Sequence, residues 1–154
     1  MLDWILMTTW TTNREARFHY DLLQKWEAGI ELVGLEVKSV KAGRVNLTGA
    51  HAVVRGGEVY LLNADIAPYQ PANTPFDYDS RRTRKLLLTK KEIGQLVELE
   101  KEKRLTIIPL SMYSKGRQIK VELALARGKK QYDKREAIKK RDTKRLIDRT
   151  LKSK

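Results

Sequence analysis

The two histidines are the first side chains to consider for catalysis or metal binding. His19 and His51 fall on different predicted elements, and neither belongs to a cluster with the spacing of a metal site. The sequence has no Cys, which excludes thiolate metal sites, a Cys nucleophile and disulfides. The carboxylates are scattered among Lys and Arg, as is typical of solvated ion pairs. Gly56-Gly57 indicates a hairpin turn and no phosphate-binding loop, so we predict no enzyme activity, no metal and no cofactor.

Basic side chains gather at two places in the first 127 residues. One group is Arg81, Arg82, Arg84 and Lys85, just before Leu86-Leu87-Leu88, and the other is Lys38, Lys41 and Arg44. A basic loop that is held at one end by an apolar core segment loses little entropy on binding. Both groups are therefore candidate phosphate-binding sites, with a solvated charged loop as the alternative. Tyr113 and Tyr132 lie near Lys and Gly, and each is either a base-stacking ring or a packed tyrosine.

The overall charge indicates a polyanionic partner. The chain has 32 Lys and Arg against 19 Asp and Glu, a formal net charge of +13. Nucleic acid and anionic membrane are the two candidates. No apolar run reaches the roughly 20 residues needed to span a bilayer, and the tail has no Trp or Phe with which to enter a membrane surface. We therefore predict an RNA-binding protein without membrane contact, and the absence of Cys suits a cytoplasmic location.

Much of the positive charge lies at the C-terminal end. Residues 128–154 carry twelve Lys or Arg and four Asp or Glu, a net of +8, which leaves +5 for residues 1–127. The apolar residues of this tail are too few to bury a face, so it is predicted to be disordered in the free protein. Ala137, Ile138, Leu146, Ile147 and Leu151 nevertheless have loose helical spacing. Folding of the tail on RNA is therefore expected.

The elements that must position these residues are mostly short strands. A capping box at Thr12–Glu15 predicts a helix that runs to Gly29, with Phe18, Leu22 and Trp26 on its inner side. Extended structure is predicted over 30–37 with a break near Gly34, and further strands over 50–55, 58–62, 105–113 and 118–126, with Gly56-Gly57 as a tight turn. A second helix begins at the capping box Thr89–Glu92 and ends near Lys103, and residues 68–83 form a long loop with three prolines.

The fold class that follows is mainly β with flanking helices. Hairpin-length links between neighbouring strands predict an antiparallel sheet, and the best architecture is an oligonucleotide-binding-like (OB-like) β-barrel plus the basic tail. We expect one domain over 13–127, the tail over 128–154 and a flexible leader over 1–12. Met7 is a candidate start, because the ordered pattern begins after it.

Five segments of the chain resemble those of one known family. They are Asn13–Arg17, Glu27–Gly29, Gly34–Ser39, Arg82–Leu88 and Gly128–Arg135, which occur in this order between Asn13 and Arg141. The chain resembles the SsrA-binding protein family, also called small protein B. That resemblance implies an OB-like barrel that binds the tRNA-like domain of transfer-messenger RNA and brings it to stalled ribosomes whose A site lacks a codon. It also implies that the tail enters the decoding centre, which consists of small-subunit ribosomal RNA, and forms a helix in the empty mRNA channel.

The resemblance and the basic clusters together suggest two groups of functional residues. For the tRNA-like domain we expect Asn13, Arg14, Glu27, Glu36, Lys38, Arg44, Arg82, Arg84, Lys85 and Leu87. For the ribosome-reading tail we expect Gly128, Lys129, Lys130, Tyr132, Asp133, Lys134, Arg135, Lys139, Lys140 and Arg141. Because Glu27 is acidic, it is expected to orient a Lys or Arg, or to accept a hydrogen bond from RNA. A monomer is expected. Two rival functions are a structural ribosomal-RNA-binding protein and a general RNA chaperone.

Overall fold

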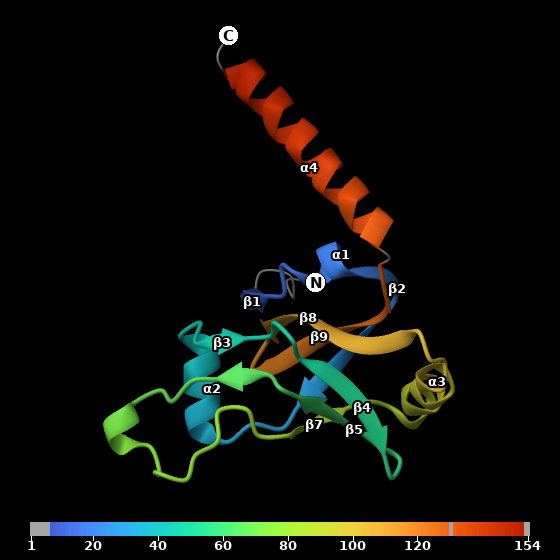
Figure 1. The fold of residues 1–154 in the computed structure, drawn as a ribbon. Coiled ribbons are helices and arrows are strands. Elements are labelled where there is room, and N and C mark those ends of the chain that lie inside the picture. Colours follow the sequence, from blue (N-terminus) through green and yellow to red (C-terminus); the bar gives the residue numbers. More distant parts are fainter. Residues whose placement is uncertain (1–6, 130, 153–154) are drawn as a thin grey trace.

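The chain forms a closed antiparallel barrel with helices outside it. The computed structural model describes residues 7–129 and 131–152 (Figure 1). Its strands are β1 (Thr8–Thr12), β2 (Tyr20–Ile30), β3 (Val45–Asn46), β4 (His51–Arg55), β5 (Glu58–Leu62), β6 (Asp65–Ile66), β7 (Arg84–Leu87), β8 (Leu105–Lys115) and β9 (Gln118–Gly128). Its helices are α1 (Ala16–His19), α2 (Gly34–Lys41), the 3-10 turn η2 (Pro71–Asn73), α3 (Lys90–Glu100) and α4 (Gln131–Lys152).

The barrel closes because β8 pairs with β4 along one edge and with β9 along the other. The main sheet has the order β1-β8-β4-β5-β7-β2-β9, and β9 pairs again with β8. All of these pairs are antiparallel, and β1 lies outside the ring on β8. The interior holds apolar residues from every side of the ring, among them Trp26, Val59, Leu86, Met112 and Leu123. This confirms the predicted mainly-β, antiparallel, OB-like fold.

Two local predictions are confirmed. β4 and β5 form the hairpin, and Gly56 and Gly57 at its turn have φ values of 60° and 76°, in the left-handed region that favours glycine. Helix α3 begins as predicted, because the Thr89 hydroxyl accepts from the backbone N–H of Glu92 and the Glu92 carboxylate accepts from that of Thr89. Leu96 is the buried residue of this helix.

The predicted helix over 13–29 is wrong. Only Ala16–His19 is helical, without a side-chain cap, and Tyr20–Ile30 is the long strand β2 between β7 and β9. Trp26 points into the core in this strand. The predicted strand over 30–37 is also wrong beyond Ile30, since residues 34–41 form α2, whose inward residues are Glu36, Ser39 and Val40. The spacing i, i+3, i+4 is helical, but two of these three residues are polar.

The prediction of a flexible leader over 1–12 fails for residues 8–12. Thr8–Thr12 form β1 and pair with β8, so they belong to the sheet, while residues 1–6 lie outside the described residues. The loop over 68–83 is present as predicted, with η2 near its middle. In the tail, α4 is helical and projects away from the barrel (Figure 1). Its disorder in the free protein stays a prediction. No helix in the described ranges is long and apolar enough to cross a membrane.

Candidate nucleic-acid interface

One row of side chains crosses the outer surface of the barrel. Cross-strand pairing places Leu87 of β7 opposite Gly29 of β2, Gly29 opposite Lys120 of β9, and Lys120 opposite Tyr113 of β8. Paired residues point to the same face of a sheet, and the alternate residues Ala28, Leu86, Met112 and Val121 point into the core. The row therefore lies on the outside. We call Glu27, Leu87, Tyr113, Lys115 and Lys120 the outer sheet face.

Glu27 holds the polar part of the outer sheet face together. Its carboxylate accepts a short hydrogen bond from the Tyr113 hydroxyl, and its other oxygen lies 3.4 Å from Lys115 Nζ. The hydrogen bond from Tyr113 lowers the pKa of Glu27, and the charge of Lys115 adds to this. Burial and the same hydrogen bond raise the pKa of Tyr113. At neutral pH an ionised Glu27 therefore faces a protonated Tyr113 and orients Lys115, in line with the expectation that it orients a Lys or Arg.

Leu87 gives this face an apolar element. Its side chain is about half exposed and lies over Gly29, where a Cβ atom would come within 3.2 Å of Leu87 Cβ. Gly29 thus lets Leu87 lie close against β2. Lys85 lies two residues earlier on the same outward side, and its ammonium group is 3.0 Å from Glu58 Oε1. The hydrogen bond to Glu58 raises the pKa of Lys85, so this lysine is charged and partly neutralised.

Two expected RNA-binding residues are inside the protein. Arg84 and Glu36 are both fully buried, so the prediction that they line the RNA-binding surface is wrong. Arg84 Nε donates to Glu36 Oε2 over 2.8 Å, and its other nitrogens donate to the carbonyls of Ala64 and Ser80. Arg82, which is half-buried, also donates to Glu36, over 3.0 Å. Tyr78 Oη donates to Glu36 Oε2 over 3.4 Å. We call Glu36, Tyr78, Arg82 and Arg84 the buried ion cluster.

Hydrogen bonds keep Glu36 ionised in this cluster. Burial opposes ionisation, but donation from Arg82, from the backbone N–H of Val33 and from Arg84 outweighs it and holds the pKa of Glu36 below its usual value. The cluster joins α2, β7 and the loop over 68–83. The cluster therefore holds these elements together. Around it, the cations that are exposed are Lys38, Lys41 and Arg44 of the α2 region and Arg81 of the loop.

A third expected RNA-binding residue, Asn13, is also buried in the protein. It is about nine-tenths buried, and its Nδ2 donates to the carbonyls of Pro109 and Leu47 over 3.0 and 3.4 Å. Its Oδ1 has no hydrogen-bond partner among the described residues. Asn13 therefore ties the start of α1 to the barrel, while the neighbouring Arg14 is exposed.

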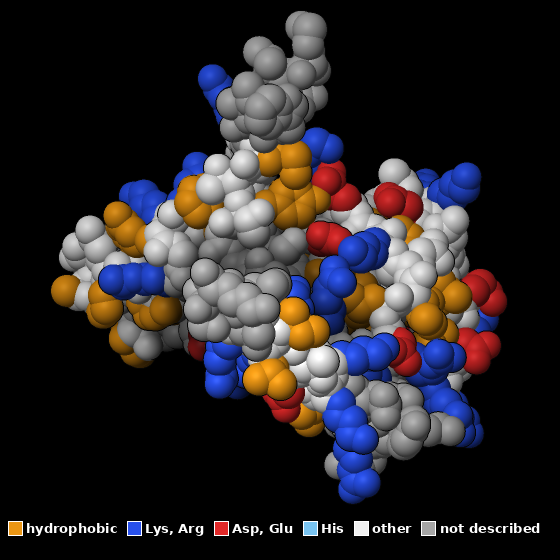
Figure 2. Space-filling view, turned by 90° about the horizontal axis from the view of Figure 1, so that it is seen from above, with side chains coloured by type: hydrophobic (Ala, Val, Ile, Leu, Met, Phe, Trp, Pro, Cys, Tyr) orange, Lys and Arg blue, Asp and Glu red, His pale blue; other side chains and the backbone are white. Residues whose placement is uncertain are grey.

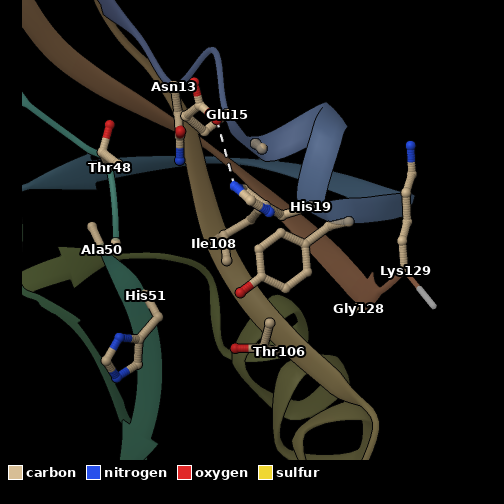
Figure 3. Close-up of a pocket in the computed structure, with 13 residues that line it drawn as sticks. Asn13, Glu15, His19, Thr48, Ala50, His51, Thr106, Ile108, Gly128 and Lys129 are labelled. Atoms are coloured by element: carbon tan, nitrogen blue, oxygen red, sulfur yellow. Dashed lines mark ion pairs between the residues drawn. The ribbon is translucent and has the colours of Figure 1, made fainter. Parts of the chain in front are cut away.

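Both histidines line one cleft of about 670 Å³ (Figure 3). His51 lines it from β4, and His19 lies 3.4 Å from Glu15, one helical turn earlier (Figure 3). The cleft also includes Gly128 and Lys129, where the tail leaves the barrel. Within the described parts of the chain, no group of three potential metal ligands occurs. The spacing of His19 and His51 in the sequence could not predict that they line the same cleft, because only the barrel fold places α1 and β4 on either side of it.

The root of the tail is fixed to α1. Gly128 is the last residue of β9, and Lys129 donates from its backbone N–H to the His19 carbonyl and from Nζ to the Arg17 carbonyl, over 2.9 and 2.7 Å. Further along α4, Arg141 lies over the ring of Phe18 at 5.7 Å. The expected tail cations Arg135, Lys139, Lys140 and Arg141 are exposed. Lys130 lies outside the described residues, and only the helical backbone is described for Tyr132, Asp133 and Lys134.

Lys115 and Lys120 were missed from the sequence alone. Lys120 lies on the predicted strand over 118–126, so its outward position could have been read from the alternation of that strand. Lys115 lies in the predicted turn between the two strands, and only the structure extends β8 to it. The proximity of both lysines to Glu27 could not be read from the sequence, because it depends on the pairing of β2 with β9. Figure 2 shows Lys and Arg side chains spread over one face of the molecule with apolar side chains among them.

A closed antiparallel barrel with a basic and apolar outer face and a basic terminal helix defines a class of nucleic-acid-binding barrel proteins. Comparison with known families agrees. The family described as SmpB protein matches residues 10–153, and the chain belongs to that family. The resemblance inferred from the five sequence segments is thereby confirmed.

Individual relatives match over nearly the whole chain. The SsrA-binding protein of Gloeothece citriformis (strain PCC 7424) is 50% identical over 142 residues, which are 92% of each chain. The SsrA-binding protein of Chloroflexus aurantiacus (strain ATCC 29366 / DSM 635 / J-10-fl) is 54% identical over 91% of this chain and 88% of that protein. A chain in the solved structure "tmRNA-SmpB: a journey to the center of the bacterial ribosome" is similar with a TM-score of 0.67 and 45% identity, over 83% of this chain and 93% of that one.

Proposed function

We propose that this chain binds the tRNA-like domain of transfer-messenger RNA with its barrel and delivers that RNA to stalled ribosomes in trans-translation. The observation that carries the proposal is membership of the SmpB protein family over residues 10–153, together with relatives that are SsrA-binding proteins. The similarity to a chain from a tmRNA-SmpB ribosome structure supports the same assignment.

The outer sheet face is the proposed RNA contact of the barrel. Lys115 and Lys120 supply charge for phosphates, and Leu87 supplies an apolar surface for a ribose or base edge. Glu27 positions Lys115 and can accept a hydrogen bond from an RNA hydroxyl or amine. Lys38, Arg44, Lys85 and Arg14 are exposed or half-exposed cations that can extend this contact. Asn13, Glu36 and Arg84 take part indirectly, by positioning the segments around them.

The tail is the proposed ribosome contact. Helix α4 has 22 residues, so at 1.5 Å per residue it is about 33 Å long. A helix of that length with exposed Arg135, Lys139, Lys140 and Arg141 suits a channel lined by ribosomal RNA phosphates. In this proposal the residues from Gly128 to Arg135 read the decoding centre, and the rest of α4 occupies the empty mRNA channel.

The chemistry of trans-translation would be carried out by the RNA and the ribosome. In this proposal the chain is not an enzyme, has no cofactor, and works as a monomer in the cytoplasm. The barrel and the tail are separate functional units, with the barrel beginning at β1 and the tail at Gly128.

Two measurements test the proposal against its rivals. The first is a binding titration of the chain with transfer-messenger RNA and with an unrelated structured RNA of equal length at one salt concentration. Strong preference for transfer-messenger RNA is expected, whereas a general RNA chaperone would bind both about equally. The second is sedimentation with ribosomes from cells. Enrichment on stalled ribosomes is expected, and a constant ratio to all ribosomes would instead identify a structural ribosomal protein.

A further inference from the structure

The loop over 68–83 carries an aromatic side chain that the protein does not bury. Phe76 has a relative exposure of 103%, whereas the other exposed large apolar side chains in the described part of the chain do not exceed 63%. In Figure 1 this loop lies at the left of the molecule, away from α4. At the left edge of Figure 2, apolar side chains reach the surface beside Lys and Arg. An unburied phenyl ring contributes nothing to the core and is free to contact a partner.

The first limb of the loop is tied to α2 and the residues after it. Ser39 Oγ donates to the Ala67 carbonyl over 2.6 Å, and the Ala67 N–H donates to the Arg44 carbonyl over 3.1 Å. Arg44 Nη1 in turn donates to the carbonyls of Pro68 and Tyr69 over 3.4 and 3.3 Å. These bonds bring the loop next to the exposed cations of the α2 region.

The second limb is tied to the buried ion cluster. Tyr78 Oη donates to the Ile66 carbonyl over 2.7 Å, and Arg84 Nη2 donates to the Ser80 carbonyl over 3.0 Å. The Tyr78 N–H also donates to the Pro75 carbonyl over 3.0 Å, which makes 75–78 a turn with Phe76 at its second position. Phe76 is therefore presented at the tip of a turn that is held from both sides, so little backbone entropy remains to be lost on binding.

The charges around the loop indicate the kind of partner. Lys38, Lys41, Arg44 and Arg81 are exposed cations in this region, while Asp77 and Asp79 are exposed acids on the loop itself. The negative charge of Asp77, directly next to Phe76, repels anionic lipid head groups and phosphate groups, so neither an anionic membrane nor a phosphate is favoured in contact with the ring. A nucleobase fits better, because it stacks on the phenyl ring, its amino groups can donate to a carboxylate, and its phosphates can reach the cations of the α2 region.

We propose that Phe76, at the tip of the loop over 68–83, stacks on an unpaired base of transfer-messenger RNA. The inference rests on the proposed function. The loop belongs to the barrel and lies at the other end of the molecule from α4, which is the proposed ribosome contact (Figure 1). Phe76 therefore adds a stacking contact to the phosphate and apolar contacts of the outer sheet face.

Three variants of full-length protein separate stacking from other roles of the side chain. Phe76→Ala removes the ring, Phe76→Leu keeps an apolar side chain without a π face, and Phe76→Trp keeps an aromatic ring. Equilibrium binding to full-length transfer-messenger RNA is measured for each across a range of salt concentrations. Phe76→Ala and Phe76→Leu should weaken binding by about five-fold to 150-fold, the range for loss of one stacked base, whereas Phe76→Trp should bind within about two-fold of wild type. The salt dependence should not change, because no charge is removed.

The controls distinguish failure of the inference from failure of the proposed function. All three variants should unfold like wild type, because Phe76 has no buried surface to lose. If the wild type itself does not prefer transfer-messenger RNA, the proposed function fails. If the wild type binds and Phe76→Ala binds equally well, the stacking contact is overturned while the function stands. Full binding by Phe76→Leu overturns stacking in favour of a simple apolar contact, and a loss seen only with ribosomes overturns the choice of partner.

Discussion

Arg84 and Glu36 form an ion pair in which neither side chain reaches solvent, although they lie 48 residues apart in the chain. The pair joins strand β7 to helix α2, and the remaining guanidinium N–H groups donate to backbone carbonyls. Breaking a buried pair leaves the other charge without its partner, which costs far more than the loss of a surface ion pair.

We expect Arg84→Ala to destabilise the fold. The buried Glu36 carboxylate would lose its fully buried partner, so the free energy of unfolding should fall by about 3–5 kcal/mol. Urea unfolding at neutral pH measures this. The exposed neighbour Arg81→Ala is the matched control and should change stability by no more than about 0.5 kcal/mol. Equal effects of the two substitutions would show that the buried pair does not stabilise the fold.

Acid should destabilise the protein through Glu36. Its pKa is lowered in the folded state relative to the ordinary value of 4.5, so the stability it contributes is complete above pH 4.5 and is lost as the pH falls through the folded-state pKa. Urea unfolding of the wild type should therefore become easier below that pH. In the double variant Glu36→Gln, Arg84→Met, which removes the carboxylate and its buried partner, the decrease between neutral pH and acid should be smaller. An unchanged pH dependence in the double variant would assign acid sensitivity to other carboxylates.

Affinity for transfer-messenger RNA should fall steeply with salt. Each lysine that neutralises a phosphate adds about 0.7–0.9 to the log–log slope. Lys38→Ala with Lys41→Ala should flatten that slope by roughly one to two units, because both lysines are exposed on α2. Lys101→Ala is the control, because Lys101 follows helix α3, which lies on the opposite side of the barrel from α2 (Figure 1). Its slope should equal that of the wild type.

Glu27→Gln should weaken RNA binding even though it makes the protein more positive. The amide cannot hold Lys115 by charge or accept from Tyr113 as strongly, so the outer sheet face loses its order. A loss of about two-fold to ten-fold is expected, the usual range for one hydrogen bond. Glu122→Gln removes an acid from the same sheet, where Glu122 pairs with Lys25 at 3.4 Å, and should leave binding equal or better. If both substitutions improve binding alike, Glu27 acts only as an unfavourable charge.

The tail should be needed on the ribosome and not for binding free RNA. Truncation after Lys129 keeps the contacts of Lys129 with α1, so the fold and the affinity for transfer-messenger RNA should be retained while tagging of stalled chains fails. Asp133→Asn should slow peptidyl transfer on stalled ribosomes despite its added positive charge, because on the ribosome Asp133 is proposed to hold Lys134 and Arg135 in place or to accept a hydrogen bond from a base. Loss of such a contact should slow the step by about five- to 150-fold. A tail of the same composition in scrambled order should also be slow. Wild-type rates with the scrambled tail would reduce this segment to a polycation.

Short-range signals in the sequence were enough for several elements. Gly56-Gly57 permits the positive φ of a tight turn, and the Thr89–Glu92 capping box needs only four residues, so the β4–β5 hairpin and the start of α3 were predicted correctly. The basic tail, the antiparallel barrel and the family resemblance could also be predicted. Each depends on a property of consecutive residues: the charge of the tail, the alternation of apolar and polar residues in the strands, and the identity of the five segments.

Tertiary structure decided the elements whose local pattern fits two conformations. Phe18, Leu22 and Trp26 recur every four residues, a spacing close to one helical turn. Phe18 does lie in the short helix α1, but pairing with β7 and β9 makes residues 20–30 a strand. For residues 34–41 the inward face includes Glu36 and Ser39, so an apolar pattern could not reveal the helix.

The same dependence on distant partners governed the candidate site. Arg82, Arg84 and Lys85 look alike in the sequence, but strand alternation in β7 turns Arg84 inward with Leu86 and Lys85 outward with Leu87. An arginine can occupy that inward position only because α2 brings a carboxylate to it. The sequence by itself determined that the chain is a basic barrel protein with a basic tail. Which of its cations face RNA and which hold the fold was decided by tertiary structure, since burying a charge requires a partner that local sequence does not specify.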